Sequence, residues 1–263
     1  HKALYAALLT PQGKMQFDFF LSEAEDGSIF IDCEAGQKAD LLRRLMLYRL
    51  RSKAEITDRS DDFDIWVLSS DSLAQKELSQ WPVMGDGAGD AAAFAQGVIY
   101  RDPRHQGIGL RAILAQNAET LAPKPIDPTG QSYEIRRLEL GLLDGSRDYL
   151  ADKTLALEAN LDLLNGVDFT KGCYIGQELT ARTKHRGKIR KRLLPVIIKG
   201  GAPVEGTPIE KNGKAVGEIR SHAGDRAIAL IRIEDLDHPD LLADGRPVQI
   251  IHPDWLDEKP QST

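Results

Sequence analysis

Asn165-Gly-Val-Asp-Phe-Thr-Lys-Gly-Cys-Tyr-Ile-Gly-Gln-Glu-Leu-Thr-Ala-Arg182 is the stretch of this sequence that carries the most chemical information. Gly176 stands where the pattern predicts the start of a helix that runs to about Lys184. Cys173 therefore lies just before a helix N-terminus, two residues after Lys171. The helix N-terminus and the Lys171 side chain both create positive potential at the cysteine. This potential favours the thiolate form and makes the sulfur more reactive. The pattern predicts a reactive or metal-avid thiol at position 173.

The same stretch also has plain structural interpretations. Cysteine is among the most often buried residue types, so a lone Cys173 could simply pack in a core. An acid in the first turn of a helix interacts favourably with the helix dipole, so Glu178 could serve the helix alone. In the functional interpretation, the Glu178 carboxylate accepts two N–H donors from a planar heterocycle. The residues by themselves leave both interpretations open.

Upstream of this stretch, strand-like and helix-like patterns alternate. Two apolar runs separated by Thr-Pro-Gln-Gly predict a hairpin, and later runs predict further strands. The predicted strands are Leu4–Leu9, Met15–Leu21, Ser28–Asp32, Ala54–Thr57, Phe63–Leu68, Phe94–Tyr100 and Leu110–Ala115. Apolar residues at helical spacing predict helices over Gln37–Leu50 and Gln131–Leu140. Strands mixed with helices in this way indicate an α+β fold.

Downstream of Ile189 the pattern changes to short β-rich runs. The predicted strands are Arg192–Lys199, Ala215–Arg220, Ala227–Ile233 and Pro247–Ile251, separated by turn dipeptides such as Asn-Gly and Asp-Gly. Several short strands at that spacing predict a small closed barrel. We therefore expect an α+β region over residues 1–189, with two subdomains that divide near residues 85–125. A barrel over residues 190–257 and a disordered tail over residues 258–263 follow.

The composition limits the classes of function. The 263 residues are 41% hydrophobic and 28% charged, as in globular proteins. A formal net charge of −6 argues against a wholly basic nucleic-acid binder. No run approaches the roughly 20 apolar residues that a membrane span requires, so we expect no membrane partner. Two cysteines suit a reducing compartment, and they cannot fill the four ligand positions of an ordinary iron–sulfur cluster.

Seven lysines and arginines fall within the eleven residues from Arg182 to Arg192, with no acid among them. In an acidic protein this local excess indicates an anionic partner. The guanidinium groups of Arg182 or Arg186 can pair bidentately with the carboxylates of a small ligand. Nucleic-acid phosphates are a competing ligand, although the run lacks the interleaved aromatic residues that single-strand binders use. A solvated face at a domain junction is the plain alternative.

Lys171-Gly-Cys-Tyr-Ile-Gly-Gln-Glu178 resembles the K-G-C-Y-x-G-Q-E motif of the YgfZ branch of the GcvT-like folate-binding family. Other segments resemble the family in the same order along the chain. They are Leu8–Lys14 followed by Asp18–Phe20, Asp102–Arg104 with Gly109 and Arg111, Arg137–Gly141, and Glu158–Asp162 leading to Gly166–Phe169. The likeness covers most of the chain, and the cysteine motif is its most specific part. The family's Thr-Asn-Asp element, whose aspartate lies at the folate site, has no match in this sequence.

The resemblance implies a fold and a site. The fold is a GcvT-like cloverleaf of two ferredoxin-like α+β portions plus a C-terminal small β-barrel, around a central tetrahydrofolate pocket. Cys173 is the implied functional thiol, and no permanently bound metal is expected. The implied cofactor-binding residues are Lys171, Tyr174, Gln177, Glu178, Arg182, Arg137 and Glu139.

The resemblance also implies a function. It is that of a tetrahydrofolate-binding protein that assists the assembly or repair of iron–sulfur clusters in client enzymes, rather than that of an ordinary enzyme. The implied partners are assembly or client proteins, and the implied location is cytoplasmic, or the mitochondrial matrix in a eukaryote. One alternative is a folate-dependent aminomethyltransferase or demethylase of the same fold, which does not need this cysteine. A second alternative is an RNA-associated folate-binding module that uses the run from Arg182 to Arg192.

Overall fold

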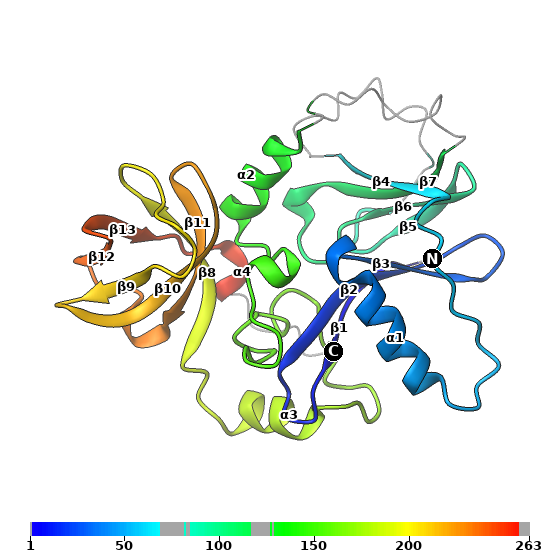
Figure 1. Cartoon of the computed structure of the whole chain (residues 1–263), viewed down its shortest axis with the longest axis horizontal. Coiled ribbons are helices and arrows are strands. Elements are labelled where there is room, and N and C mark those ends of the chain that lie inside the picture. The colour runs from blue at the N-terminus through cyan, green and yellow to red at the C-terminus, as the bar shows by residue number, and fades with distance from the viewer. Residues whose placement is uncertain (1, 69–81, 83–84, 117–126, 128, 258–263) are drawn as a thin grey trace. The chain divides into compact units, whose positions relative to one another are not determined.

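The chain folds into two compact units, which the computed structural model describes over residues 2–68, 82, 85–116, 127 and 129–257. The first unit comprises His1–Ala6 and Phe17–Pro128, and the second comprises Ala7–Gln16 and Thr129–Thr263. A hairpin near the N-terminus therefore contributes to both units (Figure 1). Among the described residues, no helix has the length and apolar character that crossing a membrane requires.

Two sheets and one α-helix make up the described part of the first unit. The strands are β1 (Leu4–Leu9), β2 (Met15–Glu23), β3 (Ile29–Cys33), β4 (Phe63–Leu68), β5 (Ala91–Phe94), β6 (Gly97–Arg101) and β7 (Leu110–Ala115), and the helix is α1 (Lys38–Arg49). The strand orders are β1-β2-β3 and β4-β7-β6-β5. Buried apolar side chains such as Ile99, Ala112 and Leu114 form the core of the four-stranded sheet. Short 3₁₀ turns at Ala35–Gln37 and Gln106–Ile108 complete the described part of this unit.

Two buried ion pairs hold the first unit together. Asp32 on β3 pairs with Arg111 on β7 at 2.6 Å. Arg104 pairs with Asp102 at the same distance, and its guanidinium lies 4.8 Å from the ring centroid of Phe20. Because these charges are largely removed from water, each needs its partner to remain ionised without a large free-energy cost.

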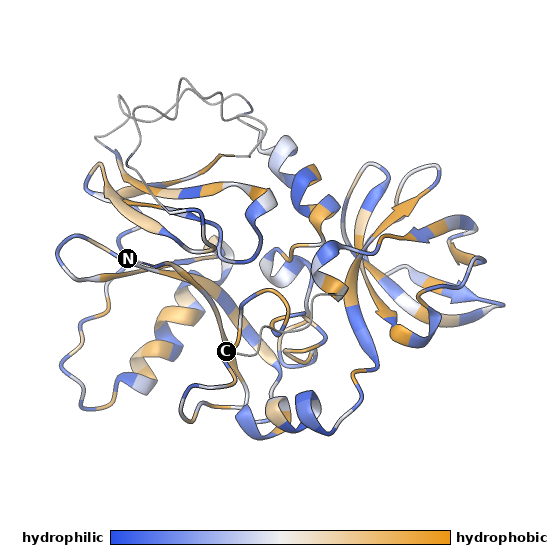
Figure 2. Cartoon of the chain, turned by 180° about the vertical axis from the view of Figure 1, so that it is seen from behind, coloured by the Kyte–Doolittle hydropathy of each residue, from blue (hydrophilic) through white to orange (hydrophobic). Residues whose placement is uncertain are grey.

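The second unit is built on a closed six-stranded barrel. Its elements are α2 (Gln131–Leu140), α3 (Gln177–His185), β8 (Lys191–Ile198), β9 (Pro208–Lys211), β10 (Lys214–Ala223), β11 (Arg226–Arg232), β12 (Leu241–Ala243), β13 (Arg246–Ile250) and α4 (Asp254–Asp257), with 3₁₀ turns at Gly145–Arg147 and Ile233–Asp235. The strand order around the barrel is β10-β11-β8-β13-β12-β9. The core of the barrel is formed by buried apolar side chains from its strands, and these strands carry both apolar and hydrophilic residues (Figure 2). Ile198, Ile209 and Ile219 are among the fully buried core residues.

Helix α2 is attached to the barrel at its C-terminal end. It ends at Gly141, which has a left-handed φ of 69°. A Cβ at this position would lie 2.8 Å from Cδ of Pro195 on β8, so the close approach requires glycine. The indole Nε1 of Trp255 on α4 donates to the carbonyl of Leu140 at 2.8 Å. These contacts fix the end of α2 against β8.

The predicted α+β class and the predicted C-terminal barrel are confirmed, and so are most of the predicted elements. The prediction of a strand over Ala54–Thr57 is wrong, because that segment has no regular structure. The strand predicted over Phe94–Tyr100 is two strands, since Ala95 and Gln96 both have positive φ and form a two-residue hairpin turn. The barrel also contains β9 and β12, which were not predicted.

The predicted domain boundaries stay predictions. The barrel lies in the same compact unit as α2 and α3, so compactness alone does not mark a division at residue 190. The tail predicted as disordered, residues 258–263, lies outside the described residues.

Candidate functional site

Cys173 lies in a short loop, Lys171–Gly176, which we call the thiol loop and which leads directly into α3. The cysteine is exposed and forms no disulfide. A Cβ added at the preceding Gly172 would meet no atom within 4 Å. The thiol therefore does not pack in a core, and the chain beside it leaves room for another molecule.

Gln177 fixes the thiol loop to the start of α3. Its side-chain Oε1 accepts a hydrogen bond from the backbone N–H of Tyr174 at 3.1 Å. Its own backbone N–H donates to the Tyr174 carbonyl at 3.2 Å. This reciprocal pair resembles a helix-capping arrangement and orders the residue that follows the cysteine.

Tyr174 and Lys171 contact each other across the thiol loop. The Lys171 Nζ lies 4.8 Å from the centroid of the Tyr174 ring, which is a cation–π distance. The Tyr174 hydroxyl is buried and has no hydrogen-bond partner among the described residues. Burial, followed by the nearby Asp168 charge, raises the pKa of Tyr174 above its ordinary value. A buried hydroxyl of this kind can still accept a partner, because an unmade hydrogen bond costs free energy.

The thiol loop rests on the turn of the first hairpin, Thr10–Gly13. Gly176 is buried with a φ of 82°, and a Cβ there would lie 2.5 Å from the Thr10 carbonyl oxygen. On the other side of this contact, a Cβ at Gly13 would lie 2.9 Å from Oγ1 of Thr180 on α3. The Thr180 hydroxyl itself donates to the Gly176 carbonyl at 2.9 Å. Two glycines at the point of contact therefore allow the hairpin turn to approach the beginning of α3.

The approach to the thiol loop is ordered by local contacts. Oδ1 of Asp168 accepts hydrogen bonds from the side chain and the backbone N–H of Thr170, both at 2.7 Å. These bonds lower the pKa of Asp168. The ring of Phe169 lies edge-on to His185 at 6.0 Å, and Lys184 Nζ lies 5.6 Å from the Phe169 centroid. The segment before Cys173 is therefore packed against the C-terminal end of α3.

Glu178 and Arg182 on α3 and Arg186, the residue that follows it, are exposed and lie at intervals of four residues. Residues four apart lie on one face of a helix. The structure gives none of these three side chains an ion pair with another described residue, although Glu178 and Arg182 have the spacing for one. Helix α3 is mostly hydrophilic along its length (Figure 2).

Two other cations of this region are paired inside the fold. Arg192 donates to both carboxylate oxygens of Asp162, at 3.0 and 3.1 Å, and Lys184 pairs with the same carboxylate at 2.9 Å. The Asp162 side chain has 0% exposure. Burial opposes its ionisation, but the hydrogen bonds from Arg192 and Lys184 hold the pKa of Asp162 below its ordinary value.

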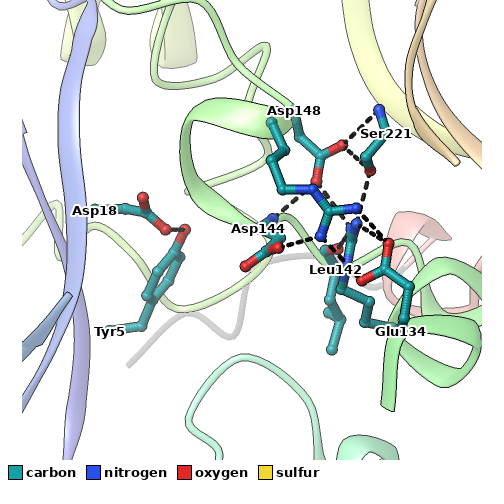
Figure 3. A network of polar contacts seen from close by, with 9 residues as sticks. Tyr5, Asp18, Glu134, Leu142, Asp144, Asp148 and Ser221 are labelled. Carbon is teal, nitrogen blue, oxygen red and sulfur yellow. Dashed lines mark hydrogen bonds and ion pairs between the residues drawn. The ribbon is translucent and has the colours of Figure 1, made fainter. Parts of the chain in front are cut away.

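Arg137 lies in a different environment from the thiol loop. Its side chain is fully buried, and all five of its N–H groups donate within the protein. The acceptors are both carboxylate oxygens of Glu134, the Leu142 carbonyl, Asp148 and the Ser221 hydroxyl. Glu134, Asp148 and Ser221, which all accept hydrogen bonds from Arg137, lie close together in the polar network of Figure 3. A ligand could therefore bind Arg137 directly only if it displaced one of these acceptors.

Glu139 is engaged as well. One of its carboxylate oxygens pairs with Arg226 on the barrel at 3.1 Å, and the other accepts from Arg136 at 3.3 Å. Five of the predicted cofactor-binding residues thus lie on the thiol loop and along α3. They are Lys171, Tyr174, Gln177, Glu178 and Arg182. Arg137 and Glu139 lie instead on α2, and their side chains bind other residues of the protein.

The second cysteine, Cys33, ends strand β3 and is half-buried. Burial, together with the charges of Asp32 and Asp18, raises the pKa of Cys33 to about 11. A thiol with such a pKa is almost entirely protonated at neutral pH and reacts slowly. Among the described residues, no group of three or more His, Cys, Asp or Glu side chains is arranged to hold a metal ion.

Sequence reasoning did not single out Gly13 and Asp162 as parts of this site. Both lie in segments that resemble the family pattern, Leu8–Lys14 and Glu158–Asp162. That resemblance was the only signal available, because their contacts with Thr180 and with Arg192 join parts of the chain that are far apart in sequence.

Comparison with known proteins identifies the family. Residues 190–258 match the CAF17 C-terminal beta-barrel domain. The mouse protein "Iron-sulfur cluster assembly factor IBA57, mitochondrial" is 31% identical over 97% of this chain and 73% of its own length. The human protein of the same name is 33% identical, over 97% of this chain and 72% of its own. This chain belongs to the IBA57 family.

A fungal IBA57 homologue from Pyricularia oryzae is 32% identical over 92% of this chain and 65% of its own length. The crystal structure of the glycine cleavage system aminomethyltransferase T from Bartonella henselae has a TM-score of 0.74, at 15% identity, over 97% of this chain and 76% of that one. At that identity the likeness concerns the fold alone, and it confirms the predicted GcvT-like fold. The IBA57 relatives named here are mitochondrial, as expected for eukaryotic members of the family.

Proposed function

We propose that this protein assists the assembly or repair of iron–sulfur clusters in client proteins, with Cys173 as its functional thiol and tetrahydrofolate as its cofactor. Its IBA57 relatives are named as iron–sulfur cluster assembly factors, and this supports the general role. The observation that carries the residue assignment is the exposure of Cys173 on a loop that Gln177 ties to the start of α3. A thiol in that setting can reach a cluster that another protein holds.

In this proposal, the Cys173 thiolate is one of the ligands of the cluster's iron atoms. A cysteine binds iron as the thiolate, so the thiol proton is released to water when the iron–sulfur bond forms. An ordinary cluster has four thiolate ligands, so the remaining ligands come from the protein that delivers or receives it. The cluster is thus a transient cargo, shared with an assembly or client protein. The open space beside Gly172 supports such an approach.

Tetrahydrofolate, when bound, would place a reduced pterin close to the thiol. The exposed Glu178 carboxylate can accept N–H groups of a pterin, and the exposed Arg182 guanidinium can pair with the carboxylates of the folate tail. The half-buried Tyr174 ring, with Lys171 Nζ 4.8 Å from its centroid, can pack against a flat heterocycle. The oxygen of Gln177 is already used for the thiol loop, so its role is to hold that loop. Arg137 and Glu139 support the fold in this proposal.

The test of the thiol uses the second cysteine as a matched control. In cells that depend on this protein, we expect Cys173→Ala to lower the activity of iron–sulfur enzymes, and Cys33→Ala to leave it near the wild-type level. Protein levels are measured alongside, so that loss of protein is not mistaken for loss of function. Full activity with Cys173→Ala would remove the thiol from the proposal.

The cofactor is tested separately by titrating the purified protein with tetrahydrofolate. We expect binding that is weakened at least tenfold in Glu178→Gln and is unchanged in Glu210→Gln, which alters an exposed carboxylate on β9. Absence of binding would remove the cofactor but leave the thiol proposal standing. Rapid formation of methylene-tetrahydrofolate from an aminomethyl donor would instead favour an aminomethyltransferase.

A further inference from the structure

Four exposed basic side chains follow the thiol loop along α3 and beyond its end. They are Arg182, Arg186, Lys188 and Arg190, which we call the basic strip. The structure gives none of them an acidic partner among the residues that it describes. They stand out in a chain whose formal net charge is −6.

The neighbouring cations show that this exposure is selective. Lys184 and Arg192 belong to the same basic run, but both turn inward to the buried carboxylate of Asp162. The fold therefore neutralises two cations of the run and leaves the basic strip facing solvent. If these cations only covered the protein surface, nothing would require some of them to be paired inside and the others to stay exposed, since such charges can point in any direction.

The spacing of the basic strip fits an extended peptide. Arg182 and Arg186 are four residues apart at the end of α3, which corresponds to about 6 Å along the helix axis. Side chains on one face of an extended strand recur every 6 to 7 Å or so, because the rise is about 3.3 Å per residue. Gly187 packs against Thr183, where a Cβ would lie 2.8 Å from the Thr183 Cα.

The thiol loop, which precedes α3, exposes an apolar side chain as well as the thiol. Ile175, in the thiol loop, is 39% exposed although it is a large apolar residue. The exposed Cys173 lies two residues before it. Exposed apolar residues and arginines are both typical of surfaces that bind another protein, and here α3 separates the two.

We propose that the basic strip and Ile175 form a docking surface for an acidic segment of a partner protein, which brings that partner to the thiol loop. This inference rests on the proposed function, because it names the kind of protein that meets Cys173. Carboxylates of the segment pair with the guanidinium groups, and the attraction between opposite charges speeds the encounter.

A nucleic acid fits the same surface less well. The run from Arg182 to Arg192 contains no Phe, Tyr or Trp on which bases could stack. The net negative charge of the chain also opposes a long polyanion, which extends beyond the local positive surface. A short acidic peptide does not meet this repulsion to the same degree.

The experiment measures binding of a fluorescent ten-residue polyglutamate peptide to the whole chain at 50 mM salt. We expect R186Q/K188Q/R190Q to weaken binding at least tenfold. This variant spares Arg182, which the proposed folate site uses. The control variant K199Q/K214Q/R232Q removes the same number of exposed positive charges from the barrel, and we expect it to bind like the wild type. We expect Cys173→Ala to bind the peptide normally, so this result does not depend on the fate of the thiol proposal.

A second measurement places the peptide relative to the thiol. We expect saturating peptide to slow the reaction of Cys173 with N-ethylmaleimide several-fold, as followed by mass spectrometry, without changing the reaction of Cys33. The inference is wrong if the peptide does not bind, binds both triple variants equally, or leaves Cys173 unprotected. It is also wrong if a ten-nucleotide polyuridylate binds in place of the peptide, since that outcome favours nucleic acid.

Discussion

Two charged regions of the second unit use arginine in opposite ways. Around Arg137, every N–H group of a fully buried guanidinium meets an acceptor of the protein itself. On the basic strip, arginines lie in solvent without an acidic partner among the described residues. A buried charge is tolerated only when it is paired and hydrogen-bonded, so it contributes to the fold and not to binding. An exposed charge costs the fold little and remains available to a ligand.

Replacement of Arg137 should produce the largest effect. We expect Arg137→Met to lower the free energy of unfolding by about 3–5 kcal/mol, because Asp148 would become an uncompensated buried carboxylate. The matched change on the exposed side, Arg182→Met, should alter it by less than about 0.5 kcal/mol. Urea denaturation of both variants gives the comparison. Equal effects would show that burial does not distinguish the two regions.

The two glycines of the thiol loop, buried Gly176 and exposed Gly172, should also differ in how strongly a substitution destabilises the protein. We expect Gly176→Ala to destabilise the protein by about 2–4 kcal/mol, because it combines a left-handed φ with a clash against Thr10. Gly172→Ala should cost less than about 0.5 kcal/mol, since a Cβ there meets nothing within 4 Å. Thermal unfolding of the two variants tests this. Similar melting temperatures would contradict the tight contact between the hairpin turn and α3.

The smallest effect concerns Asp162. This buried carboxylate pairs with Lys184 and Arg192, two cations of the basic run from Arg182 to Arg192. Its pKa is lowered in the folded protein, so its stabilising contribution is present above the unfolded pKa near 4 and is lost as the pH falls through the folded value. We expect Asp162→Asn to cost about 1–2 kcal/mol at pH 7. Below pH 4 the difference from the wild type should shrink, as urea denaturation across pH can show. A constant difference would rule out this ionisation as the cause.

Most of the fold could be predicted where the sequence pattern is strong. Helix α2 was predicted over the residues that form it, because apolar residues recur at helical spacing between Gly130 and Gly141. Strand β5 is Ala91–Phe94, and three alanines carry little strand signal, so its pairing with β6 decides its structure. The predicted strand over Ala54–Thr57 failed because no neighbouring strand pairs with it in the described chain.

The candidate site could be predicted only in part. The thiol loop and the start of α3 are contiguous in sequence, so Cys173 and its neighbours could be recognised together. The surroundings of Arg137 could not be predicted, because they include Ser221, which is 84 residues away along the chain. A sequence shows which side chain carries a charge, but not whether distant segments supply its partners.

The closed barrel leaves no unpaired strand edge among its six described strands, whereas the sheets β1-β2-β3 and β4-β7-β6-β5 each end in edge strands. A strand with free backbone N–H and C=O groups can take up a further strand from another polypeptide. Recruitment by strand addition is therefore confined to the open sheets, and a molecule that recognises the barrel must do so through side chains and connecting turns.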